Sequence, residues 1–213
     1  MKWIVRTLVL LAVLAAGPLV AVTSGLADMS RSWQTASRES TDPSPDPATT
    51  QEAVVQVFAA RAWSWRGAFG VHSWIAAKRT GADSYRVYEV IGWRARRGMS
   101  VVSVNGREPD GRWFGSAPEL LRDLRGPGVD RIIDDIEAAV KSYPYPDEYR
   151  VWPGPNSNTF IAHIGREVPD LKMDLPSTAI GKDWIPSNIV AAAPSGTGFQ
   201  LNVLGVLGVL AAK

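Results

Sequence analysis

The stretch RVWPGPNSNTFIAHIGREV (residues 150–168) decides the fold, because a short strand runs into a Pro/Gly turn and then opens an amphipathic helix. At about 100° per residue, Phe160 and Ile164 fall on one arc of that helix, and Ser157 lies near its middle. Ser157 is therefore predicted to face the core. Backbone N–H groups are unpaired at a helix start and the dipole is positive there, so a hydroxyl at this place faces donors for a developing oxyanion.

This helix start also has a plainer interpretation. Asn156 and Ser157 are both favoured N-cap residues, and a Pro/Gly turn followed by Asn-Ser is typical of an ordinary helix N-terminus. His163 lies off the apolar arc and is expected on the outer face of the helix, so the other histidine, His72, is the one available to serve Ser157. The sequence leaves open whether Ser157 is a nucleophile or part of a helix cap.

The composition is typical of one globular domain with a sizeable core, because 46% of the 213 residues are hydrophobic and 21% are charged. A net charge of +2, without a run of basic and aromatic residues, argues against nucleic-acid binding. The chain has no cysteine, which excludes a disulfide, a thiolate nucleophile and a zinc–thiolate site. With two histidines in the whole chain, we expect no metal site and no cofactor.

The N-terminus has the pattern of a targeting segment. Lys2 and Arg6 precede an uncharged run from Thr7 to Val22, and small residues follow it as far as Ala27. This pattern predicts either a cleaved secretory signal or a retained membrane anchor, since the apolar run is near the lower limit for crossing a bilayer. The flanking positive charges predict a cytoplasmic N-terminus and a periplasmic remainder, either free or anchored to the inner membrane.

We divide the chain into four parts. Residues 1–27 are the signal peptide or anchor, and residues 28–50, which are polar and rich in proline, are a linker or a surface strap. Residues 51–190 are the folded domain. Residues 191–213 are an apolar tail interrupted by glycines, which pairs in the core or touches a membrane and is too short to span one as a helix.

Alternation and turn signals predict an α+β fold built on an antiparallel sheet. Strands are expected at residues 70–78, 85–93 and 99–104, around Arg150, and at residues 199–203. Helices are expected after the capping-box spacings Thr49/Glu52 and Ser116/Glu119, ending near residues 61 and 124, and over residues 129–140. The Ser157 helix is expected to pack across the sheet.

Two neighbouring predicted strands carry His72 and Glu89. Glu89 shares its strand face with apolar residues such as Val87, so its carboxylate needs a partner there, and it is the best candidate to orient a histidine. Taken singly, His72 also fits a core or sheet-edge histidine. Glu89 likewise fits a sheet-edge salt bridge to Arg86 or Arg94.

A nucleophile at a helix start that faces a base on a sheet resembles the papain-like arrangement. Because His72 precedes Ser157, the chain resembles the circularly permuted papain-like group, which includes lecithin-retinol-acyltransferase-type acyltransferases and small bacterial cell-wall peptidases. In that group the helix opens with an Asn-Cys-x-x-Phe type of segment, and here residues 156–160 read NSNTF, with serine in place of the cysteine. The resemblance implies a permuted papain-like fold.

Over nearly the whole exported region, the sequence resembles a bacterial family known as domain of unknown function 3750. The segments that carry this resemblance are Gly70–Trp74 (GVHSW), Tyr88–Trp93 (YEVIGW), Arg107–Gly111 (REPDG), Trp152–Phe160 (WPGPNSNTF) and Ala179–Asp183 (AIGKD). This family has no established activity, so the chemistry is inferred from Ser157, His72 and Glu89 themselves.

Two functions of different classes are consistent with these patterns. In the first, the protein is a serine-dependent acyltransferase or hydrolase, in which Ser157 attacks an ester or amide, His72 takes its proton and Glu89 holds the imidazole. The expected binding residues are Asn156, Asn158, Trp74, Trp152 and Lys182, and the expected substrates are lipid, lipoprotein or peptidoglycan. In the second, the protein is a non-catalytic binding or scaffold module at the membrane, because a hydroxyl is harder to activate than a thiol.

Overall fold

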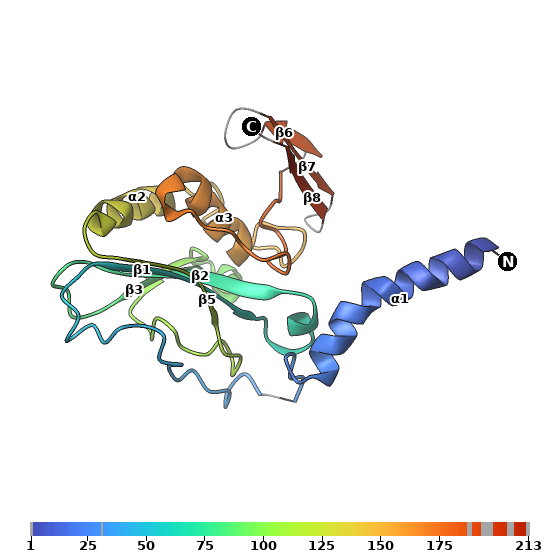
Figure 1. The fold of residues 1–213 in the computed structure, drawn as a ribbon, viewed down its shortest axis with the longest axis horizontal. Coiled ribbons are helices and arrows are strands. Elements are labelled where there is room, and N and C mark those ends of the chain that lie inside the picture. The colour runs from blue at the N-terminus through green and yellow to red at the C-terminus, as the bar shows by residue number, and fades with distance from the viewer. Residues whose placement is uncertain (1, 31, 187–188, 193–197, 204–206, 212–213) are drawn as a thin grey trace.

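The computed structural model describes residues 2–30, 32–186, 189–192, 198–203 and 207–211. These residues form a five-stranded sheet with two helices on one face, an N-terminal helix that projects from one end, and a separate three-stranded sheet (Figure 1). The predicted α+β class and the antiparallel sheet are confirmed.

The five-stranded sheet has the strand order β4-β3-β2-β1-β5. Its strands are β1 (Val54–Arg61), β2 (Val71–Lys78), β3 (Arg86–Val90), β4 (Val102–Asn105) and β5 (Glu119–Arg125). Neighbouring strands are all antiparallel, and β1 and β2 pair along their full length, from Val54↔Lys78 to Arg61↔Val71. Each strand presents alternate side chains to opposite faces of the sheet.

One face of the sheet is covered by α2 (Val129–Lys141) and α3 (Ser157–Glu167), which lie above it in Figure 1. The apolar stripes of both helices meet one core, in which Ile75, Tyr88 and Phe160 are almost completely buried. Both helices occur where the apolar periodicity of the sequence predicts them. We call this side of the sheet the helix face.

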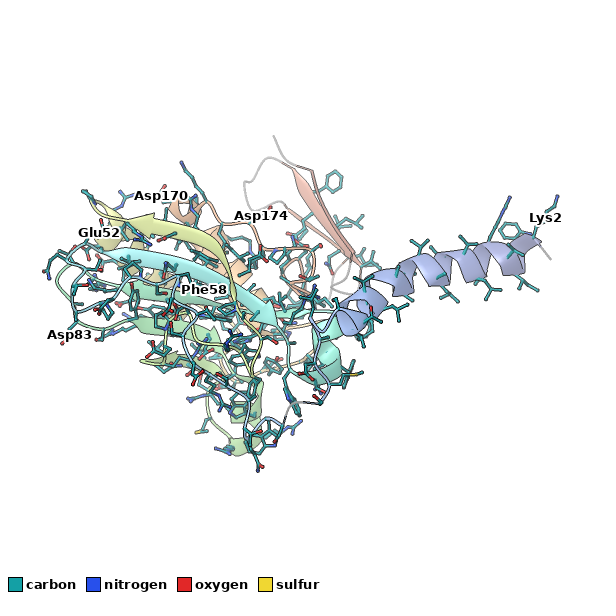
Figure 2. All side chains as sticks on the ribbon, turned by 60° about the horizontal axis from the view of Figure 1, so that its bottom comes forward. Lys2, Glu52, Phe58, Asp83, Asp170 and Asp174 are labelled. Atoms are coloured by element: carbon teal, nitrogen blue, oxygen red, sulfur yellow. The ribbon has the colours of Figure 1, made fainter. Side chains whose placement is uncertain are left out.

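The opposite side of the sheet is covered by the proline-rich segment that follows the N-terminal helix. Ser44 donates a hydrogen bond of 3.0 Å from its backbone N–H to the Asp110 carboxylate, and one of 2.7 Å from its hydroxyl to Gln56 on β1. Beneath this strap lies a second core that contains Phe58, labelled in Figure 2, and Trp74. The segment is therefore a surface strap, one of the two alternatives that its composition allowed. We call this side the strap face.

Two segments that were predicted to be helices are strands. The segment that ends at residue 61 is β1, and the segment that ends near residue 124 is β5. Both faces of β1 are buried, so its apolar residues do not simply alternate with polar ones, and the spacing of Val54, Val57 and Phe58 imitates that of a helix. In β5 the capping-box spacing is outweighed by antiparallel pairing with β1.

The predicted strand around Arg150 is also wrong. Residues 150–156 contain no strand, and the Arg150 N–H instead donates a hydrogen bond of 2.7 Å to the Pro155 carbonyl. Pro153 and Pro155 have no N–H group, so this segment could not complete a ladder within the sheet. It forms a closed loop that leads into α3.

The N-terminal helix α1 (Lys2–Thr23) has a mean hydropathy of 2.2 in its most apolar window. It is the one helix of the described residues that is long and apolar enough to cross a membrane. Its last turn packs on η1 (Ser64–Ala68), a short 3-10 helix between β1 and β2. The helix is compatible with both a signal peptide and a membrane anchor.

The described part of the apolar tail forms a small antiparallel sheet. Its strands are β6 (Val190–Ala192), β7 (Phe199–Val203) and β8 (Leu207–Ala211), in that order. The strand predicted at residues 199–203 is confirmed, and residues 193–197, 204–206 and 212–213 of the tail lie outside the described residues. The Gln200 side chain donates a hydrogen bond of 2.8 Å to the Asp183 carbonyl and so links β7 to the main domain.

Candidate functional site

Helix α3 begins with a capping box that occupies the side chain of Asn156. The Oδ1 atom of Asn156 accepts hydrogen bonds from the backbone N–H groups of Asn158 (2.9 Å) and Thr159 (3.2 Å). The Thr159 hydroxyl in return accepts one from the Asn156 N–H (3.2 Å). The Asn156 amide nitrogen donates to the carbonyl groups of Val151 (3.2 Å) and Ile180 (3.0 Å). Asn156 is therefore the N-cap, and its amide is committed to holding the helix start.

Asn158 ties the start of α3 to β2. Its Oδ1 atom accepts a hydrogen bond of 2.8 Å from the Ser73 hydroxyl, and both residues are buried. Its amide nitrogen donates hydrogen bonds of 3.0 Å to the carbonyl groups of Val71 and Ile180. A side-chain amide has two donors, and both donors of Asn158 are used, so it has none left for an oxyanion.

Ser157 is the first residue of α3 and is only 4% exposed, which confirms that it faces inward. Asn156, not Ser157, supplies the side-chain cap. Within the described part of the chain, the Ser157 hydroxyl has no hydrogen-bond partner. It lies at the positive end of the helix dipole without a base in contact.

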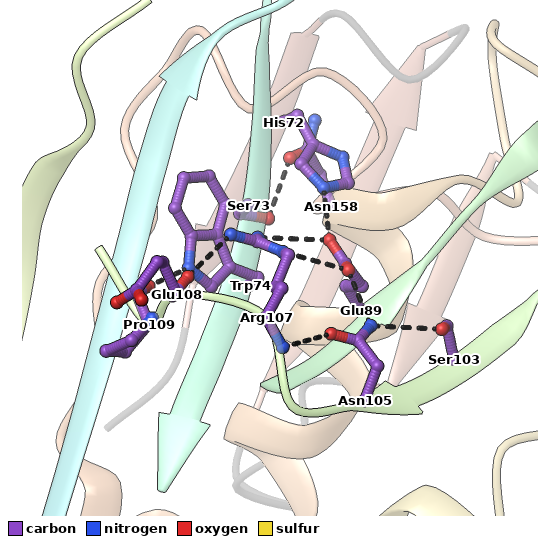
Figure 3. Close-up of polar contacts among 10 residues, drawn as sticks. All are labelled: His72, Ser73, Trp74, Glu89, Ser103, Asn105, Arg107, Glu108, Pro109 and Asn158. Carbon is purple, nitrogen blue, oxygen red and sulfur yellow. Dashed lines mark hydrogen bonds and ion pairs between the residues drawn. The ribbon is translucent and has the colours of Figure 1, made fainter. Parts of the chain in front are cut away.

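The structure places Ser157 and His72 on opposite faces of the sheet. Side chains alternate along β2, and Ser73 is the one that points to the helix face, where it meets Asn158. Its neighbour His72 points to the strap face, where it meets Glu89. Figure 3 shows both contacts. The sheet therefore separates His72 from α3, and the expected contact between Ser157 and His72 does not form.

On the strap face, His72 contacts a buried carboxylate. His72 Nε2 lies 3.2 Å from Glu89 Oε2, and the two side chains are 7% and 1% exposed. Arg107 donates two hydrogen bonds to the same carboxylate, from Nε to Oε1 at 3.0 Å and from Nη2 to Oε2 at 3.1 Å. The Asn105 amide donates to Oε1 at 2.9 Å (Figure 3). We call these four residues the Glu89 network, and within it both carboxylate oxygens are fully paired.

Burial and these partners set the charges of the network. Burial by itself raises the pKa of Glu89, but the hydrogen bond with His72 and the charge of Arg107 outweigh it and lower the pKa to about 2. Burial lowers the pKa of His72 from its ordinary value of 6.5, and the opposing effect of Glu89 does not cancel this. At neutral pH the pair is a carboxylate beside a neutral imidazole that donates its Nε2 proton to Glu89. The network therefore stabilises the negative charge of Glu89 and fixes the orientation of the His72 ring.

Aromatic rings pack against this network. The His72 ring stacks on Trp113 with 3.6 Å between ring centroids, and on Trp74 with 5.7 Å. The Arg107 guanidinium lies 4.5 Å from the centre of the Trp74 ring. Trp74 itself is completely buried, and its indole N–H donates a hydrogen bond of 2.7 Å to the Pro109 carbonyl. Trp74 thus supports the network from within and offers no surface to a ligand.

Arg107, Asn105 and Trp113 belong to this site but were not predicted from the sequence. The apolar strand face of Glu89 predicts that its carboxylate needs a partner, but the cations expected there, Arg86 and Arg94, are the ones close to it in sequence. The turn signal Asn105-Gly106 ends β4, which pairs with β3 in the register Glu89↔Ser103. Because β4 lies beside β3, the loop that follows β4 brings Arg107 to Glu89. Arg107 could therefore have been predicted as the cation only from the pairing of these two strands.

Aromatic rings form the outer edge of the network, where Trp93 is exposed and Trp113 and Phe114 are half-buried. Strand β3 is shorter than predicted, and the 3-10 helix η2 (Gly92–Arg97) carries Trp93 to the surface, where it is 45% exposed. Trp93 stacks on Trp113 and meets Phe114 edge to face, with 6.2 and 6.0 Å between ring centroids. Arg38 of the strap lies 4.7 Å above the Phe114 ring. We call Trp93, Trp113, Phe114 and Arg38 the aromatic surface.

The two remaining predicted binding residues lie outside the Glu89 network. Trp152 is exposed in the loop before α3, and Lys182 forms an ion pair of 3.3 Å with its neighbour Asp183. An open groove of about 540 Å³ lies elsewhere, between β5 and the start of α2, and contains none of the predicted site residues. Among the described residues, no three His, Asp or Glu side chains are grouped as metal ligands.

The model of a family described as a protein of unknown function (DUF3750) matches residues 52–184. The matched region contains the five-stranded sheet, both covering helices and the Glu89 network, whereas α1 and the strap precede it. No curated protein and no solved structure matches the chain.

Proposed function

The chain belongs to the DUF3750 family of proteins of unknown function, and on that premise we propose that it is a membrane-anchored binding module of the cell envelope, not a serine hydrolase. The observation that carries this proposal is that the sheet lies between Ser157 and His72. A hydroxyl becomes a nucleophile only where its base and its oxyanion donors are positioned together. Here His72 is on the strap face, and both asparagine amides at the helix start are already used.

The frame of this module is a permuted papain-like one in which the catalytic pairing has been lost. Two observations support this part of the proposal. A helix that opens with the segment NSNTF packs across an antiparallel sheet, and the histidine lies on an earlier strand of that sheet. Ser157 stands where the papain-like group has its thiol, and His72 is engaged by Glu89 on the other face.

In this proposal α1 is the anchor, and the folded domain lies in the periplasm. The helix has 22 residues, which at about 1.5 Å per residue covers roughly 33 Å and matches the thickness of a bilayer core. Lys2 and Arg6 at its start favour a cytoplasmic N-terminus. The domain that follows α1 then lies on the far side of the inner membrane.

The aromatic surface is the proposed region of ligand contact. Apolar side chains that adjoin one another at the surface mark interaction sites, and here the exposed Trp93 adjoins the half-buried Trp113 and Phe114. Trp93 is exposed but held in place, because it stacks on Trp113, and Trp113 in turn stacks on the His72 ring of the Glu89 network. The network therefore has a purpose without catalysis, since Glu89 fixes the His72 ring, and Trp113, which supports Trp93, stacks on that ring.

The chemistry of this surface suits an anionic glycan. The apolar faces of sugar rings pack on indole rings, and guanidinium groups pair with carboxylates in a bidentate way. Arg96 and Arg97 lie on η2 with Trp93, are exposed, and have no carboxylate partner among the described residues. Peptidoglycan, a glycan whose attached peptides carry free carboxylates, fits this chemistry, and we take it as the ligand.

Sedimentation with purified peptidoglycan sacculi tests this proposal. The full-length protein in detergent is expected to sediment with the sacculi, and Trp93→Ala should reduce the bound fraction several-fold. Trp152→Ala is the matched control, because Trp152 is similarly exposed (51%) but lies outside the aromatic surface. Both variants should keep the melting temperature of the wild type. Failure of the wild type to sediment, or equal sedimentation of Trp93→Ala, would contradict the proposal.

The hydrolase alternative is tested with fluorophosphonate probes that label activated serines. We expect the wild type to be labelled no more than Ser157→Ala. Labelling that disappears in both Ser157→Ala and His72→Ala, while the two variants remain folded, would overturn the binding-module proposal in favour of the enzyme.

A further inference from the structure

The end of α1 is fixed to the folded domain. Ala21 and Ala27 are 3% and 4% exposed and pack with Ala68 of η1, and Val22 lies against them. The Ala27 N–H donates a hydrogen bond of 2.8 Å to the Ala21 carbonyl, which closes the end of the helix. As Figure 1 shows, η1 therefore lies at the point where α1 leaves the domain.

Large apolar side chains around this contact are exposed. Trp65, in η1, and Phe69, directly after it, are 55% and 52% exposed and meet edge to face with 6.2 Å between ring centroids. Leu26, next to the buried Ala27, is 53% exposed. The Arg66 guanidinium lies 5.1 Å from the centre of the Trp65 ring. We call Leu26, Trp65, Arg66 and Phe69 the proximal patch.

The opposite end of the sheet has a different surface. Figure 2 shows Asp83, in the turn between β2 and β3, at the end of the molecule that lies away from α1. Within residues 79–85 and 125–130 the structure exposes no large hydrophobic side chain. Exposed aromatic residues therefore distinguish the end of the sheet next to α1 from the opposite end.

The length of α1 decides where the proximal patch must lie. The uncharged run from Thr7 to Val22 covers about 24 Å at 1.5 Å per residue. The hydrocarbon core of a bilayer is about 30 Å thick. Since no spare helix separates the bilayer from the domain, the last turn of α1 and the Ala68 that touches it lie at the level of the lipid headgroups.

We propose that the proximal patch rests in the interfacial layer of the bilayer and fixes the orientation of the domain on the membrane. This inference rests on the proposed anchoring of α1. Aromatic side chains favour the headgroup level of a membrane, and a guanidinium there pairs with anionic headgroups. Trp65, Phe69 and Arg66 supply both kinds of group in one place. The domain then stands with the Asp83 turn farthest from the bilayer.

The natural absence of cysteine allows a direct test on the full-length protein. Three variants, Phe69→Cys, Val13→Cys in α1 and Asp83→Cys, are each labelled with an environment-sensitive fluorophore. The proteins are reconstituted in vesicles of phosphatidylethanolamine and phosphatidylglycerol that contain lipids with a spin label on the acyl chain. All three residues are exposed, so labelling leaves the core intact. We expect strong quenching at positions 13 and 69, and several-fold weaker quenching at position 83.

The outcomes separate this inference from its premise. Quenching at position 13 with quenching at position 69 no stronger than at position 83 would overturn the inference and leave the anchor in place. Weak quenching at position 13 would overturn the anchor, and the inference with it. In the Phe69→Cys protein, the further change Trp65→Glu should reduce quenching at position 69 several-fold without affecting position 13, and unchanged quenching would also contradict the inference.

Discussion

The two faces of the central sheet bury polar groups by different means. On the helix face the contact is neutral, since the Ser73 hydroxyl donates a hydrogen bond to Asn158, whose amide nitrogen donates to backbone carbonyl groups. On the strap face it is ionic, since Glu89 lies between His72 and Arg107. A buried amide needs only its hydrogen bonds, whereas a buried carboxylate also needs an opposite charge.

The difference shows how two residues that are adjacent in sequence come to take part in separate sets of contacts. His72 and Ser73 are adjacent on β2, yet alternation sends them to opposite faces. Ser73 serves the start of α3, and His72 serves the aromatic surface. A catalytic pair of Ser157 and His72 would have to combine residues from the two faces. Because the contacts of the two faces are separate, we expect that each can be disrupted without the other.

The largest effect is expected from disrupting the ionic contacts of Glu89 on the strap face. Glu89→Ala leaves the Arg107 charge without its partner in a largely buried place, and should lower the free energy of unfolding by about 3–5 kcal/mol. Urea denaturation of the full-length protein measures this. The control is Asp134→Ala, whose carboxylate is 64% exposed and pairs with Arg79, and whose loss should cost less than about 1 kcal/mol. Equal losses for the two variants would contradict the comparison.

The ionic side should also make stability depend on pH. The pKa of Glu89 is about 2 in the folded protein and 4.5 ordinarily, so between these values the unfolded state binds more protons. The stability that Glu89 contributes is complete above pH 4.5 and is lost toward pH 2. At about 1.4 kcal/mol per unit, this loss is roughly 3 kcal/mol. The lowered pKa of His72 acts in the same direction, beginning below pH 6.5.

Melting temperatures measured from pH 7 downward check this prediction. The wild type should lose stability more steeply than Glu89→Gln as the pH falls below 4.5. Asn158→Ala, on the helix face, should keep the slope of the wild type. If Asn158→Ala flattened the profile as much as Glu89→Gln does, the two faces would not be independent.

A smaller effect is expected from breaking the neutral side. Asn158→Ala leaves the Ser73 hydroxyl and the carbonyl groups of Val71 and Ile180 without this partner, and should cost about 1–3 kcal/mol. Urea denaturation at neutral pH gives the value. A loss as large as that of Glu89→Ala would mean that the neutral contact matters as much as the ionic one.

The smallest effect is expected at Ser157 itself. Ser157→Ala should change the free energy of unfolding by no more than about 0.5 kcal/mol, because Asn156 supplies the cap and alanine favours helix. Asn156→Ala is the control and should cost about 1–2 kcal/mol through the lost cap. Denaturation curves for the two variants measure this. A larger loss of stability for Ser157→Ala than for Asn156→Ala would contradict the assignment of Asn156 as the N-cap.

Local patterns predicted some of these features well. The Pro/Gly turn and the apolar arc predicted α3 and the burial of Ser157, and the period of residues 129–140 predicted α2. The isolated carboxylate on an apolar strand face predicted that Glu89 needs a partner. The same local reasoning failed for β1, because a strand that is buried on both faces has no alternation for the pattern to reveal.

The sequence by itself determined the α+β class, the start of α3 and the apolar N-terminal helix, because each depends on residues within a few positions of one another. Only the tertiary structure decided that Arg107 is the cation for Glu89, since that contact depends on β4 lying beside β3. It also decided which face His72 takes. Alternation requires His72 and Ser73 to point apart, but only the packing of α3 against Ser73 determines which of the two meets the helix.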